Sequence, residues 1–336
     1  MVVRIGARPS PLSMAQTGHV AAMLADRGID SELVPVTTDG DTDRRHLTEI
    51  GGTGVFAQAL RARLAAGDVD LAVHSAKDLP TAPAPGLVVA AHPVREDSAD
   101  VLVGRRLADL ADGVRIGTGS PRRQSQLQAW AGEQGIGVEV VPIRGNVGTR
   151  LDLVRRGEVD AVVLAAAGLR RLGLFAESTA TVEGLVAETL ADEVMLPAPA
   201  QGALALEVVE GNDEILKLVR EIDDPVTSAC VAAERALLAR LEAGCMAPVG
   251  AVARPVDPCG NGPDLTMAAV IGRTVGDRSD HTGRIQVLRV TGQGPIADAA
   301  DLGIRLADEL LDRLDGQSVR DPGGREHGTQ DWQQQN

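Results

Sequence analysis

Aromatic residues are almost missing from this chain of 336 residues, which has two phenylalanines, two tryptophans and no tyrosine. Proteins that bind single-stranded nucleic acid usually stack its bases on aromatic side chains, so the composition argues against that class. Apolar residues still make up 44% of the chain, which is enough to bury a core. That core has to be aliphatic.

Cysteine and long apolar runs are scarce as well. Three cysteines in a chain of this length do not make a disulfide framework. The sequence contains no run of about 18 apolar residues that could cross a membrane. No apolar leader precedes the first strand-like segment. We therefore expect a cytoplasmic protein without a membrane partner.

Lysine is nearly absent, since Lys77 and Lys217 stand beside 31 arginines, and the net charge is −14. This charge argues against nucleic acids and anionic membranes as partners. The span 115–171 nevertheless holds nine arginines and five acidic residues. A genomic preference for arginine explains the choice of residue but not the clustering. The cluster therefore predicts a site for an anionic small molecule.

Strand-like and helical segments alternate along most of the chain, which predicts βαβ units around largely parallel sheets. VRIG occurs at 3–6 and again at 114–117, and GDVDLAVHS at 67–75 is echoed by GEVDAVVLA at 157–165. Because both echoes come in the same order, we predict two related α/β lobes. The pattern after them indicates a small α+β domain and then a polar, aperiodic tail.

Lys77 and Asp78 form the first candidate site. The strand-like run VDLAVHS leads directly into AKDLP, so both side chains lie at the carboxyl end of a strand, where open α/β sheets bind ligands. Lys77 offers a point charge in a chain that otherwise uses arginine. Asp78 is suited to stabilise a developing cation or to move protons. A solvated surface pair is the simpler interpretation of the same two residues.

The segment GTGSPRRQSQLQ at 117–128 follows a strand and begins a helix. Ser120 suits the N-cap and Pro121 the first turn, which places Arg122 and Arg123 at the helix N-terminus. Two arginines are unfavourable there because the helix dipole is already positive. We therefore expect an anion at this position, bound by backbone N–H groups and guanidinium groups.

Further basic residues stand at three other junctions between a strand and a helix. GARPSPLS contributes Arg8 and Ser10, IRGNVGTR contributes Arg144 and Arg150, and GLRRLG contributes two more arginines. Each one alone fits a surface arginine, but together they gather at the ligand-binding edge of the sheets. Dinucleotide-binding and phosphate-loop motifs are missing, and the histidines and cysteines lack metal-ligand spacing, so we expect no metal.

Cys245 lies just after a predicted helix, behind Gly244, in AAERALLARLEAGCMAPVG. A glycine there suits the left-handed residue that ends a helix, which leaves the thiol on a loop that a ligand can reach. A lone cysteine is more often a small buried apolar residue, and we interpret Cys230 and Cys259 in that way.

Six motifs occur in the order found in porphobilinogen deaminases, also called hydroxymethylbilane synthases: HSAKDLP, GTGSPRRQSQL, RGNVGTRL, AGLRRLGL, LPAPAQGALALE and LEAGCMAPVG. The chain resembles that family from about Val3 to Leu314. The resemblance implies a transferase of tetrapyrrole and heme biosynthesis. Such an enzyme joins four porphobilinogen molecules head to tail with loss of ammonia and releases hydroxymethylbilane. The resemblance also implies a dipyrromethane cofactor, bound covalently through a thioether to Cys245.

The resemblance further implies an α/β fold with two lobes like type II periplasmic binding proteins and a small C-terminal α+β domain. The expected boundaries are 1–93 and 196–217 for lobe 1, 97–192 for lobe 2, 220–316 for the cofactor-carrying domain, and 317–336 for a disordered tail.

By position in these motifs, Asp78 resembles the catalytic carboxylate that stabilises pyrrole and azafulvene cations. The residues that resemble the groups holding the cofactor carboxylates are Lys77, Thr118, Ser120, Arg122, Arg123 and Arg150. Those that resemble the groups taking the substrate and the growing chain are Arg8, Ser10, Gln16, Arg144 and Arg171. Phe56 matches a lid position, and Gln201 falls in a matching interdomain segment.

Some residues depart from the family pattern. Glu49 and Thr53 stand where many members carry lysines in a mobile loop, which weakens the case that this loop binds substrate by charge. Gly119 and Pro121 replace commoner serine and leucine residues.

Two other hypotheses stay open beside the transferase. A non-catalytic binding protein, whose two lobes close on an anionic small molecule, explains the arginines but gives Asp78 and Cys245 no task. An inactive relative of the family is suggested only by the departures at Glu49 and Thr53. For the transferase we expect porphobilinogen as the small-molecule partner, a monomer, and transfer of the product to the next enzyme of the pathway.

Overall fold

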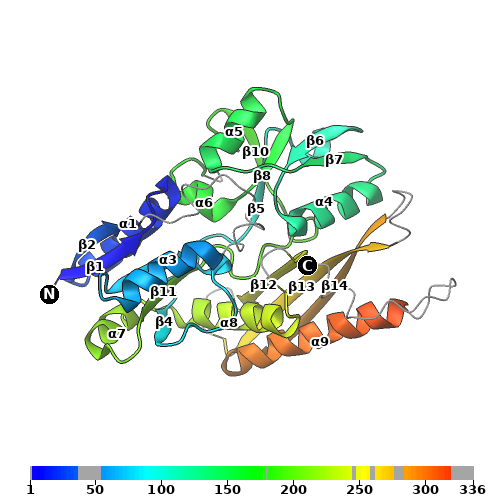
Figure 1. Cartoon of the computed structure of the whole chain (residues 1–336). Helices are drawn as coiled ribbons and strands as arrows, with labels where there is room; N and C mark the ends of the chain where they lie inside the picture. Colours follow the sequence, from blue (N-terminus) through cyan, green and yellow to red (C-terminus); the bar gives the residue numbers. More distant parts are fainter. Residues whose placement is uncertain are drawn as a thin grey trace.

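The computed structural model describes residues 2–36, 54–176, 178, 180–243, 247–257, 262–275 and 284–318. Within these residues the chain forms two α/β lobes and a third body of one sheet with two long helices (Figure 1). The predictions for Glu49, Thr53, Cys245, Cys259 and residues 319–336 of the C-terminal tail lie outside the described residues, and so does the side chain of Phe56. Residues 317 and 318, predicted to begin that tail, end the last helix instead.

Lobe 1 is built on a five-stranded sheet in the order β2-β1-β3-β11-β4. Its strands are β1 (Val2–Ala7), β2 (Asp30–Pro35), β3 (Leu71–Ser75), β4 (Leu87–Ala91) and β11 (Leu204–Val209). β1, β2 and β3 are parallel, and β11 runs antiparallel to both of its neighbours. One face is covered by α1 (Pro11–Ala25) and α7 (Asp213–Arg220), and the other by α3 (Gly54–Ala65). Because both faces are covered, β3 is apolar almost throughout.

Lobe 2 repeats this design in a six-stranded sheet in the order β7-β6-β8-β5-β10-β9. Its strands are β5 (Asp100–Val103), β6 (Val114–Gly117), β7 (Val138–Val141), β8 (Ala161–Ala165), β9 (Thr181–Val182) and β10 (Leu185–Thr189). β6 is parallel to β7 and β8, and β5 is antiparallel to β8 and β10. One face is covered by α4 (Pro121–Glu133), and the other by α5 (Val147–Arg155) and α6 (Ala166–Arg171).

The same arginine–aspartate contact joins two parallel strands in each lobe. Arg4 Nη2 lies 2.7 Å from Asp70 Oδ1, and Arg115 Nε lies 3.3 Å from Asp160 Oδ2. In both lobes the aspartate also accepts a hydrogen bond of 2.9 Å from the backbone N–H of its arginine. These matching contacts confirm the two related lobes that the sequence echoes predict.

In each lobe the antiparallel strand beside the central parallel strands arrives from the other lobe. β5 enters lobe 2 after β4 of lobe 1, and β11 enters lobe 1 after β10 of lobe 2. The predicted fold class is thereby confirmed: two periplasmic-binding-protein-like lobes of the type II kind and a small C-terminal α+β domain. The exact domain boundaries stay a prediction.

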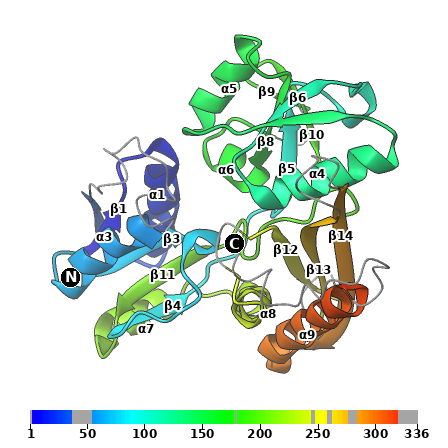
Figure 2. The same cartoon turned by 45° about the vertical axis from the view of Figure 1, so that its right-hand side comes forward.

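The C-terminal domain is an antiparallel sheet with two helices packed on one of its faces (Figure 2). Its strands are β12 (Val249–Pro255), β13 (Asp264–Val275) and β14 (Arg284–Pro295), and its helices are α8 (Pro225–Arg240) and α9 (Ala299–Ser318). α8 and α9 bury their apolar residues against one face of this sheet. They approach so closely that a Cβ atom on Gly303 would lie 2.0 Å from the carbonyl oxygen of Ala233.

The other face of this sheet contacts α4 of lobe 2. A Cβ atom on Gly272 of β13 would lie 2.4 Å from Cβ of Ser125 on α4. On β12, a Cβ atom on Gly250 would lie 3.2 Å from the side-chain amide of Gln126. These glycines let the helix that carries Arg122 pack directly on the C-terminal sheet.

Two segments cross between the lobes: the first, 92–99, joins β4 to β5, and the second, 190–203, joins β10 to β11. Glu234 of α8 ties the C-terminal domain to both. Its buried carboxylate pairs with Arg95 of the first crossing segment, at 2.6 Å and 3.0 Å. It also accepts hydrogen bonds from the backbone N–H groups of Ala200, in the second crossing segment, and of Ala253 in β12. A buried acid held by one guanidinium and two N–H groups fixes the junction of the three domains, because removing one partner would leave a buried charge uncompensated.

Short 3-10 turns lie between these elements: η1 (Ala76–Asp78), η2 (Leu107–Asp109) and η5 (Ile296–Asp298). None of the helices in the described part of the chain is both long and apolar enough to cross a membrane.

Candidate active site

Lys77 and Asp78 lie in η1, the short turn that follows β3. The turn ends at Leu79 because Pro80 cannot continue a helix. Asp78 is exposed, whereas Lys77 is partly buried. Burial lowers the pKa of Lys77, and the negative charge of Asp78 opposes that change. Lys77 Nζ donates to Gln201 Oε1 over 3.3 Å, so this lysine contacts the second segment that crosses between the lobes.

A cavity of about 110 Å³ lies in lobe 1 beside this turn. Four predicted site residues line it: Arg8, Ser10, Gln16 and Asp78. Ser10 caps α1 by accepting a hydrogen bond of 3.3 Å from the backbone N–H of Ser13. Gln16 is buried and is held from β3 by Ser75, whose hydroxyl accepts from its amide over 2.9 Å. The structure therefore gathers the polar residues predicted for lobe 1 around the catalytic candidate.

A larger cavity of about 250 Å³ lies between the first crossing segment, α8 and β12. Arg95, Cys230 and Arg254 help to line it, and none of the predicted site residues does. Burial raises the pKa of the Cys230 thiol to about 11, which agrees with the apolar role predicted for this cysteine.

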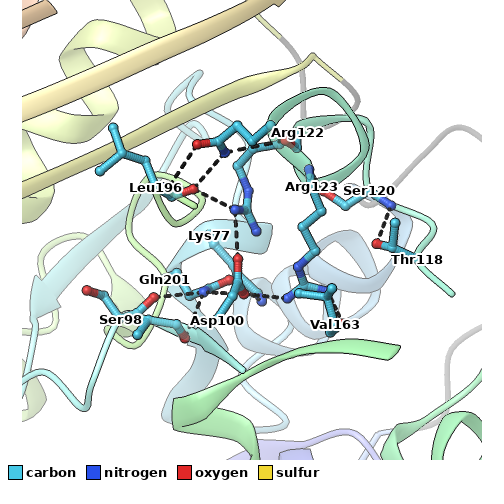
Figure 3. A network of polar contacts seen from close by, with 12 residues as sticks. Lys77, Ser98, Asp100, Thr118, Ser120, Arg122, Arg123, Val163, Leu196 and Gln201 are labelled. Carbon is cyan, nitrogen blue, oxygen red and sulfur yellow. Dashed lines mark hydrogen bonds and ion pairs between the residues drawn. The ribbon is translucent and has the colours of Figure 1, made fainter. Parts of the chain in front are cut away.

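Arg122 and Arg123 are buried at the start of α4, and both contact Asp100 of β5 (Figure 3). Arg122 Nη1 lies 2.8 Å from Asp100 Oδ2, and Arg123 Nη2 lies 2.7 Å from Asp100 Oδ1. The guanidinium groups also donate to the backbone carbonyls of Leu196 and Val163, over 2.6 Å and 2.8 Å. We expected an anion at this helix N-terminus. Asp100 of the same chain provides one negative charge to the two guanidinium groups.

Asp100 is completely buried, and it is charged because of its partners. Burial alone would raise the pKa of its carboxyl group, but the charges of Arg122 and Arg123 hold that pKa well below its usual value. Burial also lowers the pKa of Arg122, and Asp100 opposes this effect. One carboxylate beside two guanidinium groups leaves the cluster with a net positive charge.

Gln201 connects this cluster with Lys77 of lobe 1, as Figure 3 shows. Its amide donates to Asp100 Oδ1 over 2.9 Å and to the carbonyl of Ser98 over 2.8 Å, while its oxygen accepts from Lys77. The side chain thus spans both crossing segments. A continuous polar network runs from the turn that carries Asp78 to the arginines of lobe 2.

Three more residues predicted for the cofactor lie around the N-terminus of α4. Ser120 caps the helix, since its hydroxyl accepts from the backbone N–H of Arg123 over 3.5 Å. The hydroxyl of buried Thr118 accepts from the backbone N–H of Ser120 over 3.2 Å. Burial lowers the pKa of Arg150 to about 10, and the positive charge of Arg123 lowers it further. Two like charges that repel in this way favour an anion between them.

Arg144 and Arg171 are placed differently from the other predicted arginines. Arg144 is exposed in the loop between β7 and α5. Arg171 ends α6 and donates to the carbonyl of Gly202 over 2.7 Å, in the second crossing segment. Burial lowers the pKa of Arg171, and the charge of Glu96 opposes that change. Arg171 therefore contacts the residue that follows Gln201.

Sequence reasoning missed Asp100, whose partners lie more than twenty positions away. The available signal was an acidic residue at the start of the apolar run DVLV, which becomes a strand buried along its whole length. An acid in such a strand requires a cationic partner.

The helix before Cys245 ends earlier than predicted. α8 stops at Arg240, and Glu242 takes the left-handed conformation with φ +50°, instead of Gly244. The N–H of Ala243 bonds to the carbonyl of Leu238, and the N–H of Glu242 to that of Ala239, which is the Schellman pattern. The prediction placed the left-handed residue two positions too late, and Gly244 and Cys245 lie outside the described residues.

Comparison with known proteins gives one consistent family. The model of the porphobilinogen deaminase dipyromethane cofactor binding domain matches residues 3–217, and the model of the porphobilinogen deaminase C-terminal domain matches 228–312. Porphobilinogen deaminase 1 of Streptomyces coelicolor is 48% identical over 312 residues, which cover 92% of this chain and 93% of that protein. Porphobilinogen deaminase of Mycolicibacterium gilvum is 44% identical over 332 residues, which cover 97% of this chain and all of that protein.

Among solved structures, the periplasmic aliphatic sulphonate binding protein of Escherichia coli matches with a TM-score of 0.36 and 13% identity, over 72% of this chain and 70% of that one. The matching family models and the identity to whole relatives decide the assignment. The chain belongs to the porphobilinogen deaminase family.

Proposed function

We propose that this chain carries out the reaction of its family: it joins four porphobilinogen molecules head to tail with loss of ammonia and releases hydroxymethylbilane. The observation that carries the proposal is the polar network that links the Asp78 turn of lobe 1 to the arginine cluster of lobe 2 through Gln201. It connects the turn that carries the exposed carboxylate of Asp78 with the buried guanidinium groups of Arg122 and Arg123. The alternative of a non-catalytic binding protein gains no support from the family assignment.

Dipyrromethane is the cofactor of the matching family domain, and the residues present fit it. Its pyrrole rings carry carboxylates, and the Nε atoms of Arg122 and Arg123 are buried without a hydrogen-bond partner among the described residues. Buried donors of this kind call for an acceptor. The residues that would hold the carboxylates are Lys77, Thr118, Ser120, Arg122, Arg123 and Arg150. When bound, dipyrromethane supplies the carbon to which the first porphobilinogen is joined, and we propose Cys245 as its attachment point.

Asp78 is the proposed catalytic carboxylate. Its side chain lies at the wall of the lobe 1 cavity and is exposed to whatever binds there. Loss of ammonia from porphobilinogen leaves a cationic electrophile, and a fixed negative charge beside it lowers the free energy of the transition state. The same carboxylate is placed to take the proton that leaves when the pyrrole ring regains aromaticity.

Substrate and growing chain are anionic, since each added pyrrole brings two carboxylates. Arg8, Ser10 and Gln16 of lobe 1 are proposed to hold the incoming porphobilinogen beside Asp78. Exposed Arg144 and half-buried Arg171 are proposed to contact the chain as it lengthens, with bidentate guanidinium contacts to its carboxylates. Phe56 is proposed as a lid residue.

The mass of the intact purified protein tests this proposal. We expect the wild-type chain to carry a covalent adduct of two pyrrole units, and Cys245→Ser to carry none. Cys230→Ser is the matched control, because Cys230 is buried in α8 and should leave the adduct in place. Unmodified wild-type protein that folds and binds an anionic ligand would support the binding-protein alternative instead.

We further propose that the enzyme works in the cytoplasm as a monomer and transfers its product to the next enzyme of the pathway. The monomer is supported by the way each domain buries its apolar residues in a core of its own, with smaller apolar clusters where the domains meet. The domain boundaries predicted from the sequence are proposals as well.

A further inference from the structure

We propose that Arg235, on α8 of the C-terminal domain, is a positioning residue that holds the turn carrying Lys77 and Asp78 in its working conformation. The proposal rests on the catalytic function proposed above for Asp78. Arg235 is partly buried and belongs to a different domain from the turn that it contacts.

The contacts of Arg235 bracket the two predicted site residues of η1. Its Nη1 donates to the carbonyl of Leu79 over 3.0 Å and, with a longer contact of 3.4 Å, to that of Ala76. Its Nη2 donates to the carbonyl of Pro80 over 2.6 Å. One guanidinium group therefore binds the backbone immediately before Lys77 and immediately after Asp78.

The backbone of this turn needs such a donor. η1 is three residues long, and one backbone bond of 3.3 Å, from the N–H of Leu79 to the carbonyl of Ala76, closes it. Pro80 has no N–H and disfavours a helical conformation at the residue before it, so the helix cannot lengthen. The carbonyls of Leu79 and Pro80 therefore have no partner within a helix. A planar guanidinium reaches several such acceptors at once, which an ammonium cannot do with the same geometry.

The opposite side of the turn is already fixed by lobe 1. The N–H of Ala76 donates to the carbonyl of Ala203 over 3.0 Å, where β3 meets the segment leading into β11. Ala76 and Leu79 also pack in an apolar cluster that includes Val231 of α8. Arg235 adds directional contacts to this packing, and direction is what a catalytic carboxylate requires.

The contacts also set where Asp78 lies relative to the C-terminal domain. Arg235 follows Glu234, which ties α8 to both crossing segments, and Cys245 comes five residues after the end of the same helix in the sequence. α8 thereby fixes the Asp78 turn and the lobe junction from one rigid element. Moving the turn away from this domain requires breaking the hydrogen bonds to Arg235.

Arg235→Leu and Arg235→Lys in the full-length protein test the proposal. The matched control is Arg240→Leu, since Arg240 lies on the same helix and pairs with Asp308 at the surface. Turnover is counted per molecule that carries the two-pyrrole adduct, as measured by intact mass. We expect kcat of Arg235→Leu to fall by about 10- to 100-fold, the scale of a misplaced catalytic group, with KM nearly unchanged. Arg235→Lys should fall less, and Arg240→Leu should match the wild type.

Hydrogen exchange supplies a second measurement that does not depend on activity. In Arg235→Leu the backbone amides of 76–79 should exchange faster, while those of β1 keep their wild-type rates. Unchanged kcat together with unchanged exchange in 76–79 would overturn the proposal. If Arg235→Leu does not fold, the same two results in Arg235→Lys would overturn it.

Asp78→Asn, measured beside these variants, separates this proposal from the one that it rests on. Loss of turnover in Asp78→Asn, with full turnover and unchanged exchange in Arg235→Leu, contradicts only the role of Arg235. Full turnover in Asp78→Asn removes Asp78 from the reaction, whatever Arg235 does.

Discussion

The two lobes share one fold, but at several matching positions one lobe has charged residues and the other has apolar or neutral ones. In the registers of the two sheets, Leu204 of lobe 1 pairs with Ser75, and Asp100 of lobe 2 pairs with Ala165. The helix that follows a Ser-Pro cap continues with Leu12 in lobe 1 but with Arg122 in lobe 2, and the next residue is Ser13 in one and Arg123 in the other. Lobe 2 thus holds a buried ionic cluster where lobe 1 is apolar or neutral.

At the turn after the third parallel strand, the charged residues belong to lobe 1 instead. After β3, lobe 1 continues with Ala76, Lys77 and Asp78, whereas lobe 2 continues after β8 with Ala166, Ala167 and Gly168. The proposed catalytic acid therefore occurs in one lobe and the proposed cofactor arginines in the other. On this proposal, lobe 1 supplies the catalytic acid and lobe 2 supplies the arginines that hold the cofactor, and the predictions below test that division.

The largest effect is expected from Asp78→Asn, which removes the carboxylate of this turn, so that neither lobe carries one there. Because the amide neither stabilises a cation by charge nor accepts a proton, kcat should fall by about 10²- to 10⁴-fold. Steady-state turnover measures this. Asp26→Asn, at the exposed end of α1, is the control and should keep its activity. Normal turnover in Asp78→Asn would end the proposed role of lobe 1.

The second effect concerns stability and comes from the ionic cluster of lobe 2. Asp100→Asn leaves two buried guanidinium groups without their carboxylate, which should cost about 3–5 kcal/mol in the free energy of unfolding. Replacing Asp100 and Arg122 by Leu and Arg123 by Ser gives lobe 2 the residues of lobe 1. This triple variant should recover most of the loss, because no buried charge stays unpaired. Denaturant unfolding of both variants checks this, and a triple variant less stable than Asp100→Asn would contradict it.

The same cluster predicts a pH dependence with a definite sign. The pKa of Asp100 is held below its unfolded value of about 4, so its contribution to stability is complete above that pH and is lost as the pH falls through the folded-state pKa. The wild type should therefore lose stability on acidification more steeply than Asp100→Asn. Unfolding measured between neutral pH and the acid limit of the native state tests it, and parallel curves would show that Asp100 is not the responsible group.

A smaller loss of stability is expected from an alanine at one of the two matching glycines in the VRIG echo, and almost none at the other. A Cβ atom on Gly117 would lie 2.8 Å from Ile143 Cδ1, whereas one on Gly6 would lie 3.1 Å from Leu60 Cδ2. Gly117→Ala should therefore destabilise by about 1–3 kcal/mol through overpacking. Gly6→Ala should be nearly neutral, because the lost freedom of the unfolded chain offsets a mild contact. Thermal unfolding compares them, and equal losses would mean that the two lobes pack more alike than the distances indicate.

The smallest effect should be the same in both lobes. Asp70→Ala and Asp160→Ala remove the matching contacts to Arg4 and Arg115, which are partly exposed to solvent. Contacts to arginine lower the pKa of both aspartates, so both contributions persist at neutral pH and fade on acidification. Each variant should lose less stability than Gly117→Ala, and the two losses should agree. A large difference would show that only one lobe depends on this contact.

Much of the architecture could be predicted from the sequence because it depends on local pattern. The segment 2–7 corresponds to β1 residue for residue, and 113–117 contains β6 with one residue to spare. The N-caps Ser10 and Ser120 are also local features, and both accept the hydrogen bond expected of them. The echoes revealed the repeated lobes because equivalent strands need equivalent apolar residues.

The candidate site was predicted less completely, because its decisive contacts join distant positions. The sequence showed two arginines that needed an anion but not that Asp100 supplies one from another strand. Nothing local identifies Glu234 as the acid at the lobe junction, or Arg235 as the donor to the Asp78 turn. The helix end before Cys245 was misplaced because a glycine is preferred for the left-handed residue, and here a glutamate adopts it.

The division of labour between the lobes is tested most directly by one measurement, the intact mass of Asp78→Asn beside that of the triple variant at Asp100, Arg122 and Arg123. If lobe 1 carries the reaction and lobe 2 holds the cofactor, Asp78→Asn keeps the adduct of two pyrrole units and the folded triple variant lacks it. A folded triple variant with the full adduct, or an Asp78→Asn variant without it, would contradict the account.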